Sequence, residues 1–301
     1  STLSSSSAAS DVYKRQSLHL RTEHLVRLGV AATPEVAIPT LNWLLDSEHE
    51  LALVITQPDK PAGRGRNLKR SEVADWAVEH KIEVIKPEAS EDLKEHLENI
   101  DCVVTIGYGV LLPQSILDIP QFGFINLHFS LLPAYRGAAP VQRALQKGDL
   151  ISGVSVFQLE KGMDTGPIYS TISIPIEPQW RSTELLSVLS KLGPNAVEKA
   201  LQMIERGESP TPQMGDSTIA PKISKLEAQI DFRKDSTTIV NHIRAFTYEP
   251  GAWCLWKGEP FKITNAIAEK DVKLAEGAIS VDAKKVLVGC GENSAVELLS
   301  L

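Results

Sequence analysis

The residues best suited to chemistry are Asn126 and His128, near the end of an apolar stretch that reads GFINLHFSLLP. Side chains of a strand alternate between its two faces, so these two residues lie on the same face. An amide donor beside an imidazole can stabilise a negative oxygen and move a proton. Either residue alone would equally suit an ordinary hydrogen-bonded position, but the pair predicts a catalytic site at the end of this strand.

A third candidate is Asp164, in the segment GMDTGP. The glycines Gly162 and Gly166 allow a tight backbone path that can bring the carboxylate against an imidazole, although an ordinary aspartate turn would also explain the pattern. Hydrolases of the serine or cysteine type need a nucleophile of their own beside the histidine. An asparagine, a histidine and an aspartate without such a nucleophile indicate direct acyl transfer to an incoming amine.

Short apolar strands that alternate with helices are expected to position these residues. The strands are predicted near Leu28, over residues 51–56 and 83–87, from Cys102, and from Gly123. This alternation predicts an α/β fold with a doubly wound, Rossmann-like parallel sheet. Ligands of such sheets bind at the carboxyl ends of the strands, where the candidate pair and the loop after Tyr108 lie.

The chain divides into four parts by pattern. Residues 1–24 are rich in serine without apolar periodicity, and we expect them to be disordered or not native. Residues 25–208 form the predicted catalytic domain. Residues 209–225 are rich in Pro, Ser and Thr and form the predicted linker. Residues 226–301 contain several short alternating strands, which predict a small OB-like β-barrel.

Composition excludes several classes of protein. The net charge of -7 argues against indiscriminate nucleic-acid binding, although residues 60–70 hold five basic residues and no acidic one. No apolar run is long enough to span a membrane. The three cysteines and seven histidines have no ligand spacing, so we expect no metal and reduced thiols typical of a cytosolic protein. No GxGxxG follows the first strand, which argues against a dehydrogenase.

Residues 126–145, NLHFSLLPAYRGAAPVQRAL, together with GMDTGP resemble the formyltransferase superfamily that uses 10-formyltetrahydrofolate. Three further segments resemble the branch of that superfamily that formylates methionyl-tRNA. They are residues 56–66 (TQPDKPAGRGR), 136–145 (RGAAPVQRAL) and 243–253 (IRAFTYEPGAW). The similarity runs from about Leu28 to the end of the chain.

The resemblance implies a role for each candidate residue. Asn126 and His128 would polarise the formyl group and hold the oxyanion, while Asp164 would orient His128 and relay the amine proton. The formyl donor would be 10-formyltetrahydrofolate, with no metal. Part of the folate pocket would be formed by the turn after the strand, with a tyrosine nearby: Ser130, Leu131, Leu132, Pro133 and Tyr108.

The resemblance also implies a tRNA contact in the basic loop. Arg64 would be its main residue, supported by Lys60 and Arg66; an incidental charged surface loop is the alternative interpretation. The branch usually has glycine at position 32 and a Ser-Pro-Val-Lys segment at 71–74, where this chain has Ala32 and Ser-Glu-Val-Ala.

The implied partners are initiator methionyl-tRNA and folate, with no membrane, and the protein is expected to be a monomer in a bacterial cytoplasm. An organellar matrix would fit if the serine-rich start is a transit peptide. Two alternatives stay open. A sugar-amine formyltransferase would share the catalytic residues but is not expected to carry the basic loop. The second alternative is a folate- or tRNA-binding module that has lost catalysis.

Overall fold

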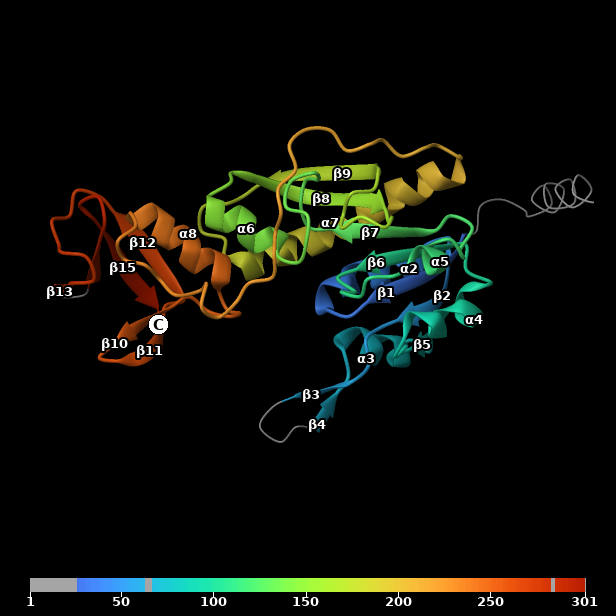
Figure 1. Ribbon diagram of the computed structural model, residues 1–301, viewed down its shortest axis with the longest axis horizontal. Coiled ribbons are helices and arrows are strands. Elements are labelled where there is room, and N and C mark those ends of the chain that lie inside the picture. Colours follow the sequence, from blue (N-terminus) through green and yellow to red (C-terminus); the bar gives the residue numbers. More distant parts are fainter. Residues whose placement is uncertain (1–25, 63–66, 283–284, 301) are drawn as a thin grey trace, which may run out of the picture.

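The centre of the molecule is a seven-stranded sheet with the order β5-β2-β1-β6-β7-β8-β9 (Figure 1). The computed structural model describes residues 26–62, 67–282 and 285–300. The predicted disordered segment 1–24 therefore lies outside the described residues. The strands of this sheet are β1 (Arg27–Ala32), β2 (Glu50–Ile55), β5 (Glu83–Ile85), β6 (Cys102–Ile106), β7 (Phe124–His128), β8 (Ile151–Gln158) and β9 (Ile168–Pro175).

The first five strands in spatial order run parallel to one another. The last two strands, β8 and β9, each pair antiparallel with the strand before them in that order. β1 pairs in parallel with β2 and β6, and β6 with β7, while β7–β8 and β8–β9 are antiparallel pairs. The predicted Rossmann-like sheet is thus confirmed, with an antiparallel extension at one edge. β8 and β9 can be antiparallel because a short glycine-containing turn joins them directly, whereas a parallel pair needs a crossover.

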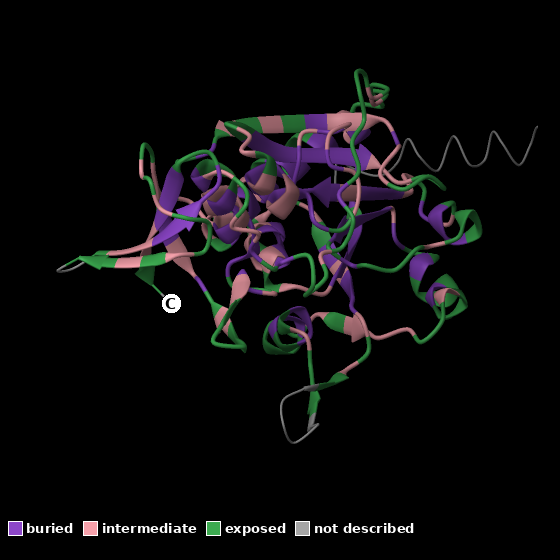
Figure 2. Cartoon of the chain, turned by 60° about the vertical axis from the view of Figure 1, so that its left-hand side comes forward, coloured by how far each residue is buried: buried purple, intermediate pink, exposed green. Residues whose placement is uncertain are grey.

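Helices cover both faces of the sheet. On one face α2 (Ile38–Asp46), α3 (Glu72–Glu79) and α7 (Ser182–Glu205) pack against buried strand residues in the larger apolar cluster. On the other face the short helices α4 (Lys94–Leu97) and α5 (Gln114–Leu117) close a smaller cluster. Figure 2 shows the central strands as largely buried. Two 3-10 turns, η1 (Glu35–Ala37) and η2 (Ser90–Leu93), precede α2 and α4.

The C-terminal part is built on antiparallel strands, as the pattern predicted. A four-stranded sheet has the order β12-β15-β14-β13, and β10 pairs with β11 in a separate hairpin. One helix, α8 (Ser236–Phe246), packs on the sheet. The strands are β10 (Trp253–Trp256), β11 (Glu259–Lys262), β12 (Asn265–Glu269), β13 (Ile279–Asp282), β14 (Lys285–Cys290) and β15 (Ser294–Ser300).

The two parts of the chain share one apolar core. α6 (Pro140–Lys147) packs against α8, and buried residues of both parts belong to the same cluster. Polar contacts add to this interface, because the Arg143 guanidinium pairs with Glu227 and the Ser182 hydroxyl donates to the Thr247 carbonyl. After α7 the chain runs back across the molecule, past β9, to reach the C-terminal part (Figure 1). Across the described ranges, no helix is both long and apolar enough to cross a membrane.

Candidate active site

Asn126 and His128 lie on β7 at the carboxyl edge of the sheet, next to β6. The parallel register places Thr105 of β6 opposite Asn126, and the Thr105 hydroxyl donates to the Asn126 Oδ1 atom at 2.8 Å. This bond fixes which end of the amide faces the sheet. Among the described residues no acceptor takes a hydrogen bond from the Asn126 amide nitrogen, so its two N–H groups can serve a bound group.

His128 is buried and held in one tautomer. Its Nε2 atom lies 2.9 Å from the carbonyl oxygen of Tyr135, which can only accept, so Nε2–H is the donor. The neutral ring then has its lone pair on Nδ1, which faces the Asp164 Oδ2 atom at 3.7 Å. Burial lowers the pKa of His128 below its ordinary value, while the Asp164 charge and the Tyr135 carbonyl act in the opposite direction. The ring is therefore kept neutral, with its basic nitrogen beside a carboxylate.

Asp164 reaches His128 from the turn between β8 and β9. Its backbone has a positive φ of 53°, and its Oδ2 atom accepts a hydrogen bond from the Gly137 amide at 2.7 Å. The flanking glycines permit this path, since a Cβ at Gly166 would lie 1.8 Å from the Gln158 carbonyl oxygen. The three predicted catalytic residues are thus brought together.

The turn that follows β7 is closed by its own hydrogen bonds. The Ser130 hydroxyl donates to a backbone carbonyl at 2.6 Å, and the Ser155 hydroxyl donates to the Ser130 carbonyl and accepts from the Leu132 amide. Ser130 and Leu132 are buried, while Leu131 and Pro133 are half-buried. The serine hydroxyls near His128 are therefore occupied in shaping this turn.

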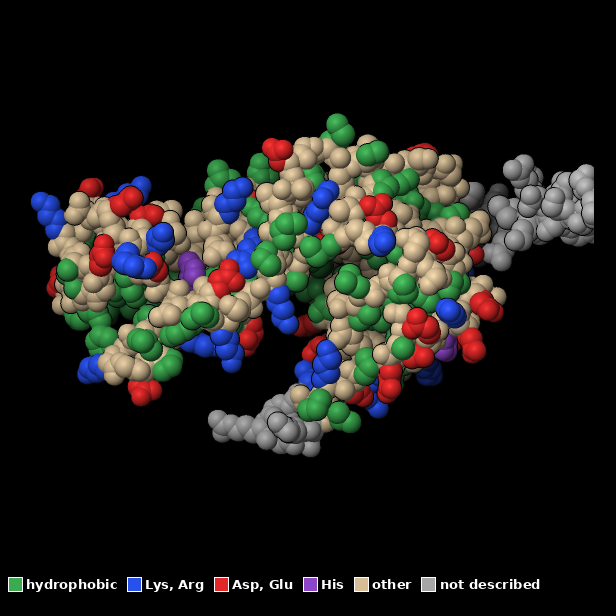
Figure 3. All heavy atoms as spheres, viewed as in Figure 1, with side chains coloured by type: hydrophobic (Ala, Val, Ile, Leu, Met, Phe, Trp, Pro, Cys, Tyr) green, Lys and Arg blue, Asp and Glu red, His purple; other side chains and the backbone are tan. Residues whose placement is uncertain are grey.

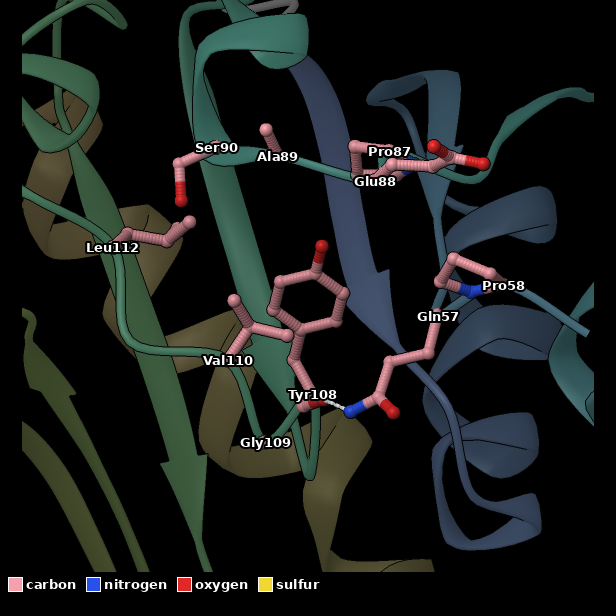
Figure 4. A pocket seen from close by; sticks show the side chains of 10 residues that line it. All are labelled: Gln57, Pro58, Pro87, Glu88, Ala89, Ser90, Tyr108, Gly109, Val110 and Leu112. Atoms are coloured by element: carbon pink, nitrogen blue, oxygen red, sulfur yellow. Dashed lines mark hydrogen bonds between the residues drawn. The ribbon is translucent and has the colours of Figure 1, made fainter. Parts of the chain in front are cut away.

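Tyr108 lines a pocket of about 370 Å³ at the same edge of the sheet (Figure 4). The segments that follow β2, β5 and β6 form its walls, and the Gln57 amide donates to the Tyr108 carbonyl at 2.6 Å. The ring of Tyr108 stands in the pocket, and burial raises the pKa of its phenol. The turn at residues 130–133 does not line this pocket.

The basic loop stands on a hairpin that projects from the sheet. Its strands are β3 (Lys60–Ala62) and β4 (Asn67–Lys69), and Lys60 donates to the side chain of Gln57 at the hairpin base. Arg64 and Arg66 lie outside the described residues. Figure 3 shows an open notch between this hairpin and the C-terminal part, with Lys and Arg side chains on both sides.

Several residues around the site were missed by the sequence interpretation. They are Thr105, which orients Asn126, Ser155, which closes the turn, and Gln213, which binds the backbone of the Asp164 turn. Each is separated from its partner by 21 to 49 residues, so no local spacing signals the contact. In the described part of the chain, no three His, Cys, Asp or Glu side chains are grouped to hold a metal ion.

This arrangement matches a known family. The formyl transferase profile matches residues 29–201, and the profile of the formyl transferase C-terminal domain matches residues 222–301. The chain belongs to the formyl transferase family. The methionyl-tRNA formyltransferase of Streptomyces coelicolor is 43% identical over 282 residues, which cover 91% of each chain. That of Thermobifida fusca is 43% identical over 271 residues, 88% of this chain and 87% of the relative. The resemblance inferred from the sequence motifs is confirmed.

Solved structures share the fold. The N-formyltransferase of Helicobacter canadensis, in complex with folinic acid and dTDP-3-aminofucose, has a TM-score of 0.69 at 19% identity, over 91% of this chain and 99% of that one. HypX of Aquifex aeolicus, in complex with tetrahydrofolic acid, has a TM-score of 0.65 at 20% identity over 92% of this chain. The present chain spans 44% of the length of HypX.

Proposed function

We propose that this chain transfers the formyl group of 10-formyltetrahydrofolate to the α-amine of methionine carried by initiator tRNA, for translation initiation. The observation that carries the proposal is the meeting of an amide, a neutral imidazole and a carboxylate at the carboxyl edge of β7. Its relatives at 40–43% identity, which are named methionyl-tRNA formyltransferases, support the choice of substrate.

Asn126 is proposed to stabilise the charge that develops on the formyl oxygen during transfer. Its Oδ1 atom is bound by Thr105, so the N–H groups are oriented before the reaction begins. Preorganised donors of this kind stabilise a transition state without rearrangement, and the loss of one typically slows turnover about 10²–10³-fold. 10-formyltetrahydrofolate supplies the formyl group: the amine nitrogen bonds to the formyl carbon, the bond between that carbon and the donor nitrogen breaks, and tetrahydrofolate leaves with the proton taken from the amine.

His128 is proposed to accept the proton of the attacking amine at Nδ1. That nitrogen is unprotonated, because the ring proton is committed to the Tyr135 carbonyl. A proton on Nδ1 would lie between the ring and Asp164 Oδ2, 3.7 Å away, where the carboxylate stabilises the positive ring and can relay the proton. General base catalysis of this kind typically contributes about 10²–10⁴-fold.

The edge of the sheet offers polar and apolar surface of the kind that folate needs. The pocket at Tyr108 combines a phenol, an amide and a serine hydroxyl with proline, valine and leucine walls. We assign folate contacts to Tyr108 and to the turn at residues 130–133. Because the Ser130 hydroxyl is already bonded, that turn is assigned the role of an apolar wall.

The acceptor tRNA is proposed to lie in the notch between the β3–β4 hairpin and the C-terminal part. Arg64 is assigned as the principal phosphate contact, with Lys60 and Arg66 in support, since guanidinium groups bind phosphate in a bidentate manner. Residues 226–301 would form the second wall of the site. We expect the protein to act as a monomer in a bacterial cytoplasm.

The test is formyl transfer from 10-formyltetrahydrofolate to three acceptors: methionine-charged initiator tRNA, the same tRNA uncharged, and a nucleotide-linked amino sugar. The proposal predicts product only with the charged tRNA. Product with the sugar would support formyl transfer to an amine but would overturn the assignment of tRNA as the acceptor. No product with either amine would favour a binding module that has lost catalysis.

A further inference from the structure

Residues 209–225, predicted as a linker, are anchored to the catalytic part of the chain by backbone hydrogen bonds. Thr211 exchanges two backbone hydrogen bonds with Ile168 of β9, at 2.7 and 2.9 Å. Further along, Thr218 and Ala220 bind the backbone of the segment after β7 at Arg136, at 2.8 and 2.7 Å. The segment therefore bridges the two loops that carry the partners of His128.

Between these anchors, both ends of the Gln213 side-chain amide form hydrogen bonds with the two loops that carry the partners of His128. Its Nε2 atom donates to the Asp164 and Gly166 carbonyl oxygens, both at 2.8 Å. Its Oε1 atom accepts from Arg136, at 2.6 Å from Nη2 and 3.2 Å from Nε. An amide has two donor hydrogens and one acceptor oxygen, so every group of Gln213 is engaged.

The Asp164 turn needs such a support. A positive φ is unfavourable for most residues other than glycine, and aspartate tolerates it without preferring it, so local preference alone does not fix the turn. The hydrogen bonds of Gln213 hold the backbone on both sides of Thr165, while the Gly137 amide holds the carboxylate itself. Without Gln213, the Gly137 amide would be the one remaining hydrogen-bond partner of Asp164 in the described part of the chain.

We propose that Gln213 is a positioning residue for formyl transfer, which fixes the Asp164 turn so that its carboxylate faces His128 Nδ1, and that Arg136 orients the Gln213 amide for this task. The inference rests on the proposed function for its kinetic consequence. A misplaced catalytic group commonly lowers turnover by up to about 10²-fold.

The experiment compares Gln213→Met, which keeps the side-chain length but removes all hydrogen bonds, with the wild type. Turnover should fall about 10–100-fold, while the KM values for charged tRNA and for folate change little. Gln213→Ala is the second variant, in case the thioether distorts the loop. The matched control is Met214→Ala, because the adjacent Met214 side chain is exposed and should leave turnover unchanged.

A second readout does not depend on activity. The pKa of His128, measured by NMR on the free protein, should fall in Gln213→Met, because the displaced carboxylate no longer favours the charged ring. Asp164 forms the one ion pair found for His128 in the described ranges. In an Asp164→Asn background, Gln213→Met should therefore add no further loss of turnover and no further shift in the His128 pKa.

Wild-type turnover and an unchanged His128 pKa in a folded Gln213→Met protein would overturn the inference. So would additive losses in the double variant, because they would indicate general structural damage. If the wild type itself transferred no formyl group to charged tRNA, the proposed function would fail, and the NMR titration would still decide the positioning role.

Discussion

The properties of His128 follow from two opposing influences on one ring. Burial disfavours the charged imidazolium, whereas the nearby Asp164 carboxylate favours it, and burial has the larger effect on the pKa. The ring is thus neutral and basic at neutral pH, yet its protonated form has a partner 3.7 Å away. A general base needs both properties, because it must be free to accept the proton and must be stabilised once it has done so.

The pH dependence of kcat/KM should report this balance. As the proposed base, His128 must be neutral to accept the proton, so activity should be lost as the pH falls through the pKa of His128 in the folded protein, which lies below the ordinary value of 6.5. The acidic limb is therefore expected below pH 6.5 in a pH–rate profile. In Asp164→Asn the limb should move to still lower pH, since the favourable charge is gone. A limb above pH 6.5 would contradict the assignment of His128 as the base.

Asp164→Asn should also abolish most turnover without unfolding the protein. The asparagine oxygen can still accept from the Gly137 amide, so the turn keeps its shape, but the charge that stabilises protonated His128 is lost. A loss of about 10²–10⁴-fold in kcat is expected, with a melting temperature close to that of the wild type. If this variant retained full activity, the proton would have to leave by another route.

The turn between β8 and β9 determines where that carboxylate lies. The two antiparallel strands return the chain to the edge of β7, and Gly166 lets the turn pass close to the Gln158 carbonyl. Gln213 then binds the turn from the segment after α7. The geometry of the proposed site thus depends on three segments that are distant in the sequence: β7, the turn between β8 and β9, and the segment after α7.

Gly166→Ala tests the importance of this turn. The added Cβ would collide with a backbone oxygen at 1.8 Å, so the turn must shift, which should destabilise the fold by about 1–3 kcal/mol and lower turnover at least about 10-fold. Thermal melts and kcat measure the two effects. Gly215→Ala is the control for turnover, because open space surrounds that glycine, and its positive φ of 96° adds only a backbone cost of roughly 1–2 kcal/mol to the fold. Full activity in Gly166→Ala would show that the position of the turn does not matter.

The sequence predicts those features that depend on local pattern. Alternating strands and helices indicated the sheet, and the two-residue spacing placed Asn126 and His128 on one face. The contacts of Thr105 and Gln213 were not predictable, because strand register and chain return are decided by packing between distant segments. Residues 209–225 form neither a helix nor a strand, so they carry no periodic pattern of side chains that would signal their contacts.

At the scale of the whole molecule, the two parts of the chain form the walls of one notch. The shared core between α6 and α8 fixes the C-terminal part relative to the sheet, and the β3–β4 hairpin faces it across the opening (Figure 3). Near the hairpin, Lys69 pairs with Glu72 at 2.8 Å, so part of its positive charge is already balanced. The binding of a large polyanion should then depend on the remaining basic residues.

Arg64→Ala should weaken the use of tRNA while folate binding stays near that of the wild type. The loss of one phosphate contact is expected to raise KM for charged tRNA and to reduce the salt slope of binding by about 1. Glu72→Gln should act in the opposite direction, because it releases Lys69. Equal losses of tRNA and folate binding in Arg64→Ala would contradict the assignment of the loop.

The most direct test of the central claim is the single-turnover rate of formyl transfer to methionine on initiator tRNA in Asn126→Ala. We predict a rate about 10²–10³-fold below that of the wild type, with unchanged folate affinity, because a preorganised donor to the reacting oxygen is lost. Gln202→Ala, an exposed position on α7, is the control. A rate for Asn126→Ala within a few-fold of the wild type would contradict the claim that this edge of β7 performs the transfer.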